Sequence, residues 1–586
     1  MKRKPRILWC GEASFLNTGY AVYAKELLSR LHKTGKYEIA ELACYASHEN
    51  PELQQIPWRV YPTLPISEEE NSIYAAKQSN QFGEWRFDDV CLDFRPDVVI
   101  DIRDWWMMEY QQRSAYRNFY NWAIMPTVDS APQQEQYINT YIDADAVFTY
   151  SEFGKDVIEN ESNSQVKILG IPSPAADYSK MRPVSNKEQH KLMHGFDEGV
   201  NIVGTVMRNQ RRKLYPNLIK CFREIIDTNP DIAKNTFLYI HACHPDLGWD
   251  LPYFIRKYNM GNHTLLTYKC RNCNHFFPSF YAGPKQSCPR CSQQTAVMPN
   301  TVFGVSTEEL ADIINWFDLY VQYSICEGFG MPQVEAAACA VPVITVDYSA
   351  MSSVGKNIKA DLIDVKSLFW DSPTHSERAI PDDHQLVDKI SKFIKMPRSV
   401  KSKKGMDCYI SAKKNYSWDK CAKIWEEYLD SVEIKEHRDT WDSPSKQYNP
   451  EIPQPPEGLS NKDFAEWCFV NILQEPEKIN SYVGTKVLRD LEYGRLTSQT
   501  LDIYYNDNSY AEGQQAYSDF SRQDACDVLS SMREYIENSE KKREYVSNLL
   551  QDKNNFDTEN NDNSEEWNSW KPTFLMAVKP EDKAQA

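Results

Sequence analysis

A chain of 586 residues is too long for a single hydrophobic core, so we expect about three domains. The 41% hydrophobic content can fill such cores, but no apolar run is long enough for a membrane span, and the basic start leads only into a short strand-like segment, not a signal peptide. The net charge of −17 argues against a nucleic acid partner, although residues 431–586 hold 30 acids against 17 bases and carry most of the excess.

Residues 1–180 alternate strand-like and helix-like segments. This alternation is typical of a parallel sheet with crossover helices, so we expect a Rossmann-like domain here. Asn17, Thr18 and Gly19 follow the first strand and open a helix that runs through Leu31 with apolar residues at helical spacing. The expected strands are Arg6–Cys10, Ile39–Tyr45, Val98–Ile102, Trp122–Thr127, Ala146–Tyr150 and Val166–Ile171.

Residues 181–432 repeat the alternation and predict a second Rossmann-like domain, closed by a helix over Tyr416–Val432. The expected fold class is therefore α/β, with two doubly wound domains that face a cleft. A ligand should lie at the carboxyl ends of the strands. The expected strands are Ile202–Met207, Thr236–His241, Thr301–Val305, Leu319–Tyr323 and Val341–Val346.

The last part of the chain differs in composition. Residues 433–460 contain five prolines and predict a linker, and residues 461–586 predict an acidic, mostly helical tail. Helices are expected over Lys462–Leu473, Tyr482–Leu496 and Ser521–Leu550. The charge of this tail fits mimicry of nucleic acid, a protein partner or self-association, and does not choose among them.

The most informative segment is the run Glu327-Gly328-Phe329-Gly330-Met331-Pro332, with Glu335 following. It predicts a glycine-rich loop that leads into a helix, with the proline at the first helical position. Glycines let the backbone approach a ligand closely, and the N–H groups at the helix start favour an anion such as a diphosphate. The two carboxylates could bind hydroxyls on either side of that phosphate, as a nucleotide sugar requires.

This segment resembles the E-x7-E signature of retaining glycosyltransferases of family 4 (glycosyltransferase group 1), with Glu327 and Glu335 as the pair. The resemblance implies a GT-B fold and transfer of a hexosyl or pentosyl group from a nucleotide-sugar donor with retention of configuration. It implies that Glu327 holds sugar hydroxyls, that Glu335 holds the ribose, and that no metal serves the transfer.

A basic loop follows the expected strand Ile202–Met207 and contains Arg208, Arg211, Arg212 and Lys213. Bases at the cleft can neutralise a diphosphate leaving group. In the family that the motif resembles, a basic pair in this loop does so; Arg208 and Lys213 match the spacing best, with Arg212 as a rival. Gly19 in the first-strand loop is a further candidate to meet a phosphate or the acceptor.

Candidates for the acceptor side come from two strand ends. Asp129 could orient an acceptor hydroxyl or stabilise positive charge at the anomeric carbon, and the alternative is that it caps the next helix. Asp104, beside Trp105 and Trp106, is the second candidate because aromatic faces stack on sugars or bases. His241 is expected to be structural. The histidine that many family members carry near Asp129 is missing.

Two C-x2-C pairs, Cys270/Cys273 and Cys288/Cys291, lie 14 residues apart. Four thiolates in this spacing predict a closed, structural zinc site, and hence a zinc-ribbon insertion over residues 268–296. No acidic residue occurs from Leu251 to Thr307, and basic and aromatic residues alternate. That pattern indicates nucleic acid binding, or else a ribbon with an aromatic mini-core and solubilising bases. The residues are Arg256, Lys257, Lys269, Arg271, Lys285 and Arg290, with Phe276, Phe277, Phe280 and Tyr281.

The sequence therefore predicts a retaining glycosyltransferase that acts on an acceptor hydroxyl, with a hydroxymethylated base in DNA as one candidate acceptor. The alternatives are a glycan or protein acceptor, an epimerase or hydrolase of the same fold, and a nucleic-acid-binding scaffold with an inactive core. Fifteen cysteines scattered through apolar segments indicate a reducing, cytoplasmic compartment, and no basic amphipathic helix points to a membrane.

Overall fold

The computed structural model describes residues 3–114, 116–300, 302–435 and 458–471. The chain divides into two compact units, residues 1–442 and 443–586. In the second unit the described part holds one helix, α17 (Asn461–Asn471), where the sequence predicts Lys462–Leu473. The other expected tail helices and most of the linker lie outside the described residues.

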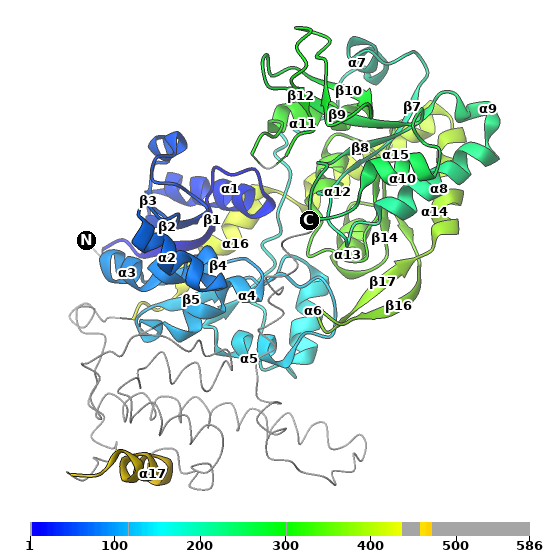
Figure 1. Cartoon of the computed structure of the whole chain (residues 1–586). Helices are drawn as coiled ribbons and strands as arrows, with labels where there is room; N and C mark the ends of the chain where they lie inside the picture. Colours follow the sequence, from blue (N-terminus) through cyan, green and yellow to red (C-terminus); the bar gives the residue numbers. More distant parts are fainter. Residues whose placement is uncertain (1–2, 115, 301, 436–457, 472–586) are drawn as a thin grey trace, which may run out of the picture. The chain divides into compact units, whose positions relative to one another are not determined.

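The first domain is built on a six-stranded parallel sheet of strand order β3-β2-β1-β4-β5-β6 (Figure 1). The order reverses between β1 and β4, which is the switch point of a doubly wound sheet. The apolar side chains of the central strands are fully buried because helices cover both faces. The strands are β1 (Arg6–Glu12), β2 (Glu38–Cys44), β3 (Arg59–Pro62), β4 (Val98–Asp101), β5 (Asn121–Ile124) and β6 (Ala146–Val147).

Three helices of this domain begin at a serine or threonine whose side chain caps the first turn. Thr18 caps α1 by accepting a hydrogen bond from the N–H of Ala21, and Gly35 ends the helix in the left-handed conformation. The helices are α1 (Gly19–Thr34), α2 (Glu68–Ala76), α3 (Glu84–Phe94), α4 (Trp105–Met108), α5 (Glu135–Asp143) and α6 (Glu152–Glu161), with 3-10 turns η1 (Pro51–Gln55), η2 (Gln78–Phe82), η3 (Glu109–Arg113) and η4 (Arg117–Phe119).

The second domain has a nine-stranded sheet of order β11-β12-β9-β8-β7-β13-β14-β15, with β10 paired to β9. Gly204 lies at its centre, where a Cβ would meet the Phe317 ring at 2.3 Å, so only glycine fits. The strands are β7 (Asn201–Val206), β8 (Thr236–His241), β9 (Thr264–Cys270), β10 (Phe276–Phe280), β11 (Lys285–Gln286), β12 (Ala296–Val297), β13 (Leu319–Gln322), β14 (Val343–Val346) and β15 (Asp361–Ile363).

Helices flank this sheet, and a separate hairpin projects from it. The helices are α7 (Lys187–Met193), α8 (Tyr215–Thr228), α9 (Pro230–Ala233), α10 (Leu251–Lys257), α11 (Thr307–Trp316), α12 (Met331–Ala338), α13 (Ser349–Asn357), α14 (Asp383–Lys395) and α15 (Arg398–Asn415). The hairpin consists of β16 (Val365–Asp371) and β17 (Ser376–Pro381).

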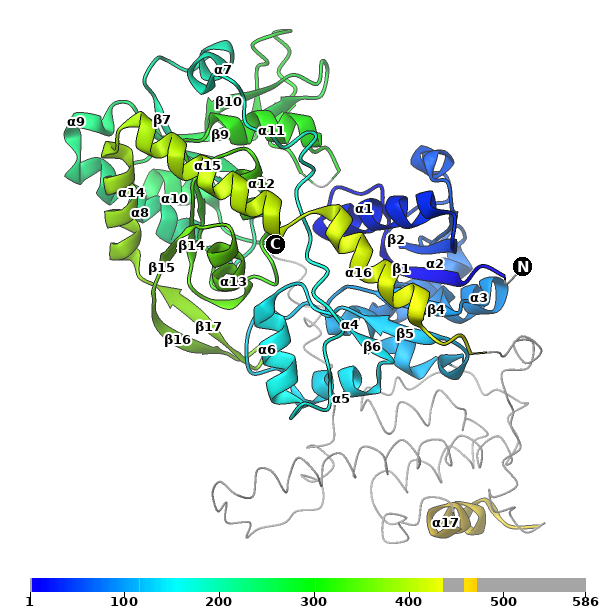
Figure 2. The same cartoon turned by 180° about the vertical axis from the view of Figure 1, so that it is seen from behind.

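The helix that follows the second domain, α16 (Trp418–Ser431), crosses back and packs beside α1 of the first domain (Figure 2). Trp425 is completely buried there; its indole N–H donates to the Tyr23 hydroxyl at 2.8 Å, and its ring lies 4.3 Å from that of Phe148. This packing fastens the end of the second domain to the first.

Two expected strands are wrong. Residues 166–171 contribute only an isolated bridge from Ile168 to Val147, because the chain leaves the sheet edge after β6. The described residues of 301–305 form no strand, since Asn300 caps a turn and Ser306 already caps α11. The strand at this side of the sheet is instead β9, which was not predicted; its last three residues, 268–270, fall in the predicted zinc insertion. Among the described residues, no helix has both the length and the apolar character to span a bilayer.

Candidate functional site

The glycine-rich loop runs from the end of β13 to the start of α12. Gly330 stands at the helix N-cap with φ of 80°, and a Cβ there would meet the Gln333 side chain at 2.9 Å, so the loop requires glycine. Pro332 is the second helical residue rather than the first, after Met331. The free N–H groups of α12 therefore open at the carboxyl edge of the second sheet.

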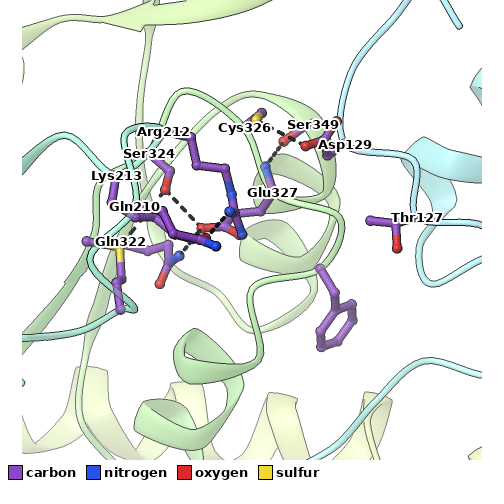
Figure 3. A network of polar contacts seen from close by, with 12 residues as sticks. Thr127, Asp129, Gln210, Arg212, Lys213, Gln322, Ser324, Cys326, Glu327 and Ser349 are labelled. Atoms are coloured by element: carbon purple, nitrogen blue, oxygen red, sulfur yellow. Dashed lines mark hydrogen bonds and ion pairs between the residues drawn. The ribbon is translucent and has the colours of Figure 1, made fainter. Parts of the chain in front are cut away.

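Glu327 is the centre of a polar network in this loop. Its carboxylate is only 6% exposed and contacts the ammonium of Lys213. The Gln322 amide and the Ser324 hydroxyl donate to its Oε1 at 2.7 and 2.9 Å. Figure 3 shows these side chains pointing toward Glu327: Lys213 comes from the loop after β7, and Gln322 and Ser324 come from the end of β13. The carboxylate is thus fixed in one orientation.

The basic side chains of the loop after β7 lie in two different places. Arg212 reaches Oε2 of Glu327 at 3.6 Å, next to Lys213. Arg208 instead pairs with Asp246 at 3.2 Å and is half exposed, while Arg211 is exposed. The structure therefore brings Arg212 and Lys213 to the first glutamate and leaves Arg208 at the rim.

Glu335, one turn inside α12, is half-buried, and its carboxylate makes no hydrogen bond or ion pair with another described residue. Burial raises the pKa of its carboxyl to about 7. An unpaired carboxylate held in apolar surroundings is costly unless a ligand donates to it.

The first domain supplies the facing wall. The hydroxyls of Tyr20 and Thr127 lie 2.8 Å apart, and Thr127 touches the glycine-rich loop, since a Cβ on Gly328 would come within 2.5 Å of its Cγ2. Gly19, at the start of α1, lies against Met331 at the start of α12. Figure 3 shows Thr127 on the domain opposite Glu327. The two domains therefore meet at this loop.

Asp129 forms an ion pair that the sequence did not predict. Arg378 of β17 donates to its Oδ1 at 2.6 Å, and the Cys326 thiol lies 3.3 Å from Oδ2. Burial alone would raise the pKa of Asp129, but Arg378 outweighs it and lowers the pKa. Asp129 caps no helix, because α5 starts after Gln134. It links the two domains.

Asp104 follows β4 and faces the same cleft. Burial and the neighbouring Asp129 raise its pKa to about 7, although Arg212 and the hydroxyls of Thr127 and Tyr20 act against this rise. It occupies the N-cap position of α4, yet its side chain makes no capping hydrogen bond. Of its aromatic neighbours, Trp105 is buried and Trp106 is 41% exposed.

Seven residues of the site were not predicted: Tyr20, Thr127, Gln322, Ser324, Cys326, Ser349 and Arg378. Ser349 accepts a hydrogen bond from the backbone N–H of Glu327 at 3.0 Å. Gln322 and Ser324 lie a few residues before Glu327 in the sequence, so their nearness to the motif could have been noticed. Arg378 carried no such signal, because it lies 249 residues from Asp129. His241 is structural, as expected: it bonds to Thr267 at 2.8 Å, and burial lowers its pKa to about 4.

The four cysteines of the insertion converge. Their sulfur atoms all lie within 4.8 Å of one another, and the pairs Cys270/Cys291 and Cys273/Cys288 are 3.6 Å apart. Four sulfurs on one tetrahedral zinc, each about 2.3 Å from it, lie about 3.8 Å apart. The two turns match, because Asn274 donates to the carbonyl of Cys270 as Ser292 does to that of Cys288. The cluster can hold a structural metal.

Of the aromatic and basic residues in and near the insertion, some belong to the core and others are exposed. Phe277 is buried and Phe276 stacks on Trp316 at 5.8 Å, so these aromatics are core, whereas Phe280 is 41% exposed. Lys269 pairs with Glu309 at 2.7 Å. The bases Arg256, Lys257, Arg271, Lys285 and Arg290 are exposed and pair with no described carboxylate.

Residues 295–404 match the family model described as glycosyl transferases group 1. No curated protein matches the chain. Among solved structures, sucrose-phosphate synthase from Thermosynechococcus elongatus is 14% identical with a TM-score of 0.53, covering 73% of this chain and 100% of that one. The N-terminal domain of Candida albicans trehalose-6-phosphate phosphatase is 13% identical, with a TM-score of 0.51 and coverage of 74% and 98%.

An Anabaena protein in complex with UDP and glucose is also similar, with 12% identity, a TM-score of 0.50 and coverage of 73% of this chain and 100% of that one. These likenesses establish the fold, and the matched family segment contains the glycine-rich loop and both glutamates. The chain has a GT-B fold, and its residues 295–404 match the glycosyl transferases group 1 family model.

Proposed function

We propose that the protein is a retaining glycosyltransferase that uses a nucleotide-sugar donor. One observation carries the proposal: Glu327 is held rigidly beside Lys213 and Arg212, at the mouth of a glycine-rich helix start. A fixed carboxylate can bind sugar hydroxyls, and cations next to helix N–H groups can bind a diphosphate. The two requirements of a nucleotide sugar thus meet at one place.

Each part of the donor has a proposed partner. Glu327 binds hydroxyls of the sugar, and Lys213 and Arg212 face the diphosphate with the backbone of Gly328, Phe329 and Gly330. Arg208, at the rim, can assist only after leaving Asp246, and Gly19 approaches from the other domain. Glu335 binds the ribose, which would supply the donors that its half-buried carboxylate lacks.

Transfer with retention forms a bond between the acceptor oxygen and the anomeric carbon on the face from which the phosphate leaves. The bond from that carbon to the phosphate oxygen breaks, and the acceptor proton passes to the departing diphosphate. Positive charge on Lys213 and Arg212 stabilises the negative charge that develops there. No metal ion is required for this step, since the cations of the chain carry that role.

We propose zinc for the four-cysteine cluster. All four ligand positions are filled by sulfur, so the ion is structural and the site is closed to substrate. The described cysteines contain no disulfide, which supports a cytoplasmic location. Zinc measured in the purified protein should reach one ion per chain, and Cys273→Ser should lower it where Cys243→Ser, outside the cluster, does not.

For the acceptor, we propose a hydroxymethylated base in DNA. The observation in its favour is that three basic residues of the insertion, Arg271, Lys285 and Arg290, are exposed and pair with no described carboxylate, and that Phe280 of the same insertion is exposed as well. Glycan and protein hydroxyls are the other acceptors to test. The acidic tail, which could bind these basic side chains or another protein, is kept in the protein used for the assay.

A label-transfer assay tests this function. Labelled nucleotide sugars are offered with hydroxymethylated duplex DNA, unmodified DNA and a glycan extract. Label on hydroxymethylated DNA alone supports both donor and acceptor. Label only on glycans keeps the transferase and rejects DNA. Release of free sugar without a labelled product favours a hydrolase, and DNA binding that survives without any donor binding favours an inactive scaffold.

A further inference from the structure

Two carboxylates of the first domain face the glycine-rich loop, and they differ in what holds them. Asp104 and Asp129 are near enough for the charge of Asp129 to raise the pKa of Asp104, and Arg212 of the opposite domain lowers the pKa of both. Cys326, the residue before Glu327, lies 3.3 Å from Asp129, and Thr127, the hydrogen-bonding neighbour of Asp104, contacts the glycine-rich loop at Gly328, so both carboxylates lie toward the proposed donor site. Either could in principle receive an acceptor.

Asp129 is already committed. Arg378 and Ser130 donate to its Oδ1 at 2.6 and 3.1 Å, and Cys326 donates to Oδ2 at 3.3 Å. The Arg378 side chain is 7% exposed, and removing its partner would leave a buried charge. The segments around the pair also join, since Ser130 bonds to Ser376 at 3.0 Å. Asp129 therefore works as a fastening between hairpin and first domain.

Asp104 has no ion pair among the described residues. Its neighbours are the neutral hydroxyls of Tyr20 and Thr127, which leave most of its lone pairs available. The ordinary structural explanation also fails, because Asp104 stands at the N-cap of α4 without capping it. The half-buried carboxylate of Asp104 therefore caps no helix, has no ion pair among the described residues, and keeps acceptor positions that a ligand hydroxyl can fill.

The place of Asp104 fits an acceptor. Thr127 beside it contacts the loop that carries Gly328, and Tyr20 follows the helix start that touches Met331. Trp106, two residues on, offers an exposed aromatic face, while Trp105 is fixed by stacking on Tyr137 at 4.6 Å. Carboxylate and aromatic face together are suited to a ligand with hydroxyls and a flat or ring-shaped apolar surface.

We propose that Asp104, rather than Asp129, binds the acceptor hydroxyl, and that Asp129 is a positioning residue that holds the hairpin β16–β17 against the first domain. This inference rests on the proposed function and refines it. The carboxylate accepts a hydrogen bond from the attacking hydroxyl and orients it toward the sugar held by Glu327.

The test compares the matched variants Asp104→Asn and Asp129→Asn in the full chain. The probes are UDP, the nucleotide sugar that gives most label in the panel above, and the panel's DNA and glycan acceptors. Asp104→Asn should lower kcat/KM for the acceptor about 100-fold while leaving donor affinity within twofold. Asp129→Asn should lower the melting temperature and keep more than a tenth of the transfer rate. Asp104→Glu should restore part of the activity.

The outcomes separate the two proposals. If the wild type transfers sugar and Asp104→Asn keeps more than a third of the wild-type rate, the inference is overturned and the proposed function stands. The same holds if, at a temperature where both variants are folded, Asp129→Asn loses more activity than Asp104→Asn. A wild-type chain that neither binds a nucleotide sugar nor transfers label overturns the proposed function, and the inference with it. Trp106→Ala, which leaves both carboxylates intact, should raise KM for the acceptor and leave donor affinity unchanged.

Discussion

The two walls of the cleft are built in opposite ways. On the second domain, Arg212 and Lys213 from the loop after β7 and polar side chains at the end of β13 fix Glu327, and these contacts all lie within one domain. On the first domain, Tyr20 lies on α1, and Asp104 and Thr127 follow β4 and β5. The donor wall is thus held by its own hydrogen bonds and ion pairs, whereas the acceptor wall contains a carboxylate, that of Asp104, with no ion pair among the described residues.

The largest effect should follow from breaking the donor wall. Glu327→Gln keeps the shape of the side chain but removes the charge that faces Lys213 and Arg212. We expect transfer and donor hydrolysis to fall together, by about 100- to 1,000-fold, because both need the sugar held in place. Steady-state kinetics measures both reactions. Glu68→Gln, in the exposed first turn of α2, is the control and should change neither. A variant that keeps hydrolysis would remove Glu327 from sugar binding.

The fastening between the walls can be broken by Arg378→Ala. This change leaves Asp129 buried without its cation, so the free energy of unfolding should drop by about 1–3 kcal/mol. The double variant with Asp129→Asn should recover part of that loss, since the charge is then gone as well. Denaturant unfolding of the four proteins of this cycle gives the coupling, and a value near zero would show that the pair fastens nothing.

The contact between the walls can be sharpened by a size swap. Gly328→Ala places a methyl group within 2.5 Å of Thr127 Cγ2, so one wall must move and transfer should fall about tenfold. Thr127→Ser removes that carbon and keeps the hydroxyl. The double variant should therefore be more active than Gly328→Ala alone. Equal activity of the two would mean that the domains do not close on this contact during turnover.

The smallest effect expected is a dependence on pH. The pKa of Asp104 is raised to about 7, so its carboxylate becomes ionised as the pH rises through 7, and transfer should increase over that range. The groups that face it are Asp129, Arg212, Tyr20, Tyr137, Tyr141 and Tyr150. Glu335, raised to about 7 as well, adds to the profile. In the Glu335→Gln variant the remaining dependence of the transfer rate on pH comes from Asp104, and adding Asp104→Asn should flatten it.

Stability should change with pH in the opposite direction. A carboxyl whose pKa is higher in the folded than in the unfolded protein binds its proton better when folded, so the free energy of unfolding falls as the pH rises from about 4 to about 7. Asp104→Asn lacks this term and should gain stability relative to the wild type over the same range. Thermal unfolding at pH 5 and pH 8 measures the difference, and an unchanged difference would place Asp104 in a more polar environment.

Sequence alone determined what depends on short spacing. The glycine-rich loop, the pair Glu327 and Glu335, and the four cysteines each lie within a few turns or one insertion, where chain geometry leaves little freedom. The alternation of strands and helices predicted the central strands of both sheets, but it missed β3, β9 to β12 and β15, and the strands expected at residues 166–171 and 301–305 do not form. Short apolar runs do not distinguish strands from extended loops.

Tertiary structure decided the rest. The pairing of Arg378 with Asp129 joins residues 249 positions apart, and no local pattern encodes it. It also separated two similar aspartates: Asp129 pairs with an arginine, whereas Asp104 lies next to two hydroxyls and has no ion pair among the described residues. Burial and nearby charge set the pKa of a carboxyl and the ligands it can bind, and both arise only when distant strand ends come together.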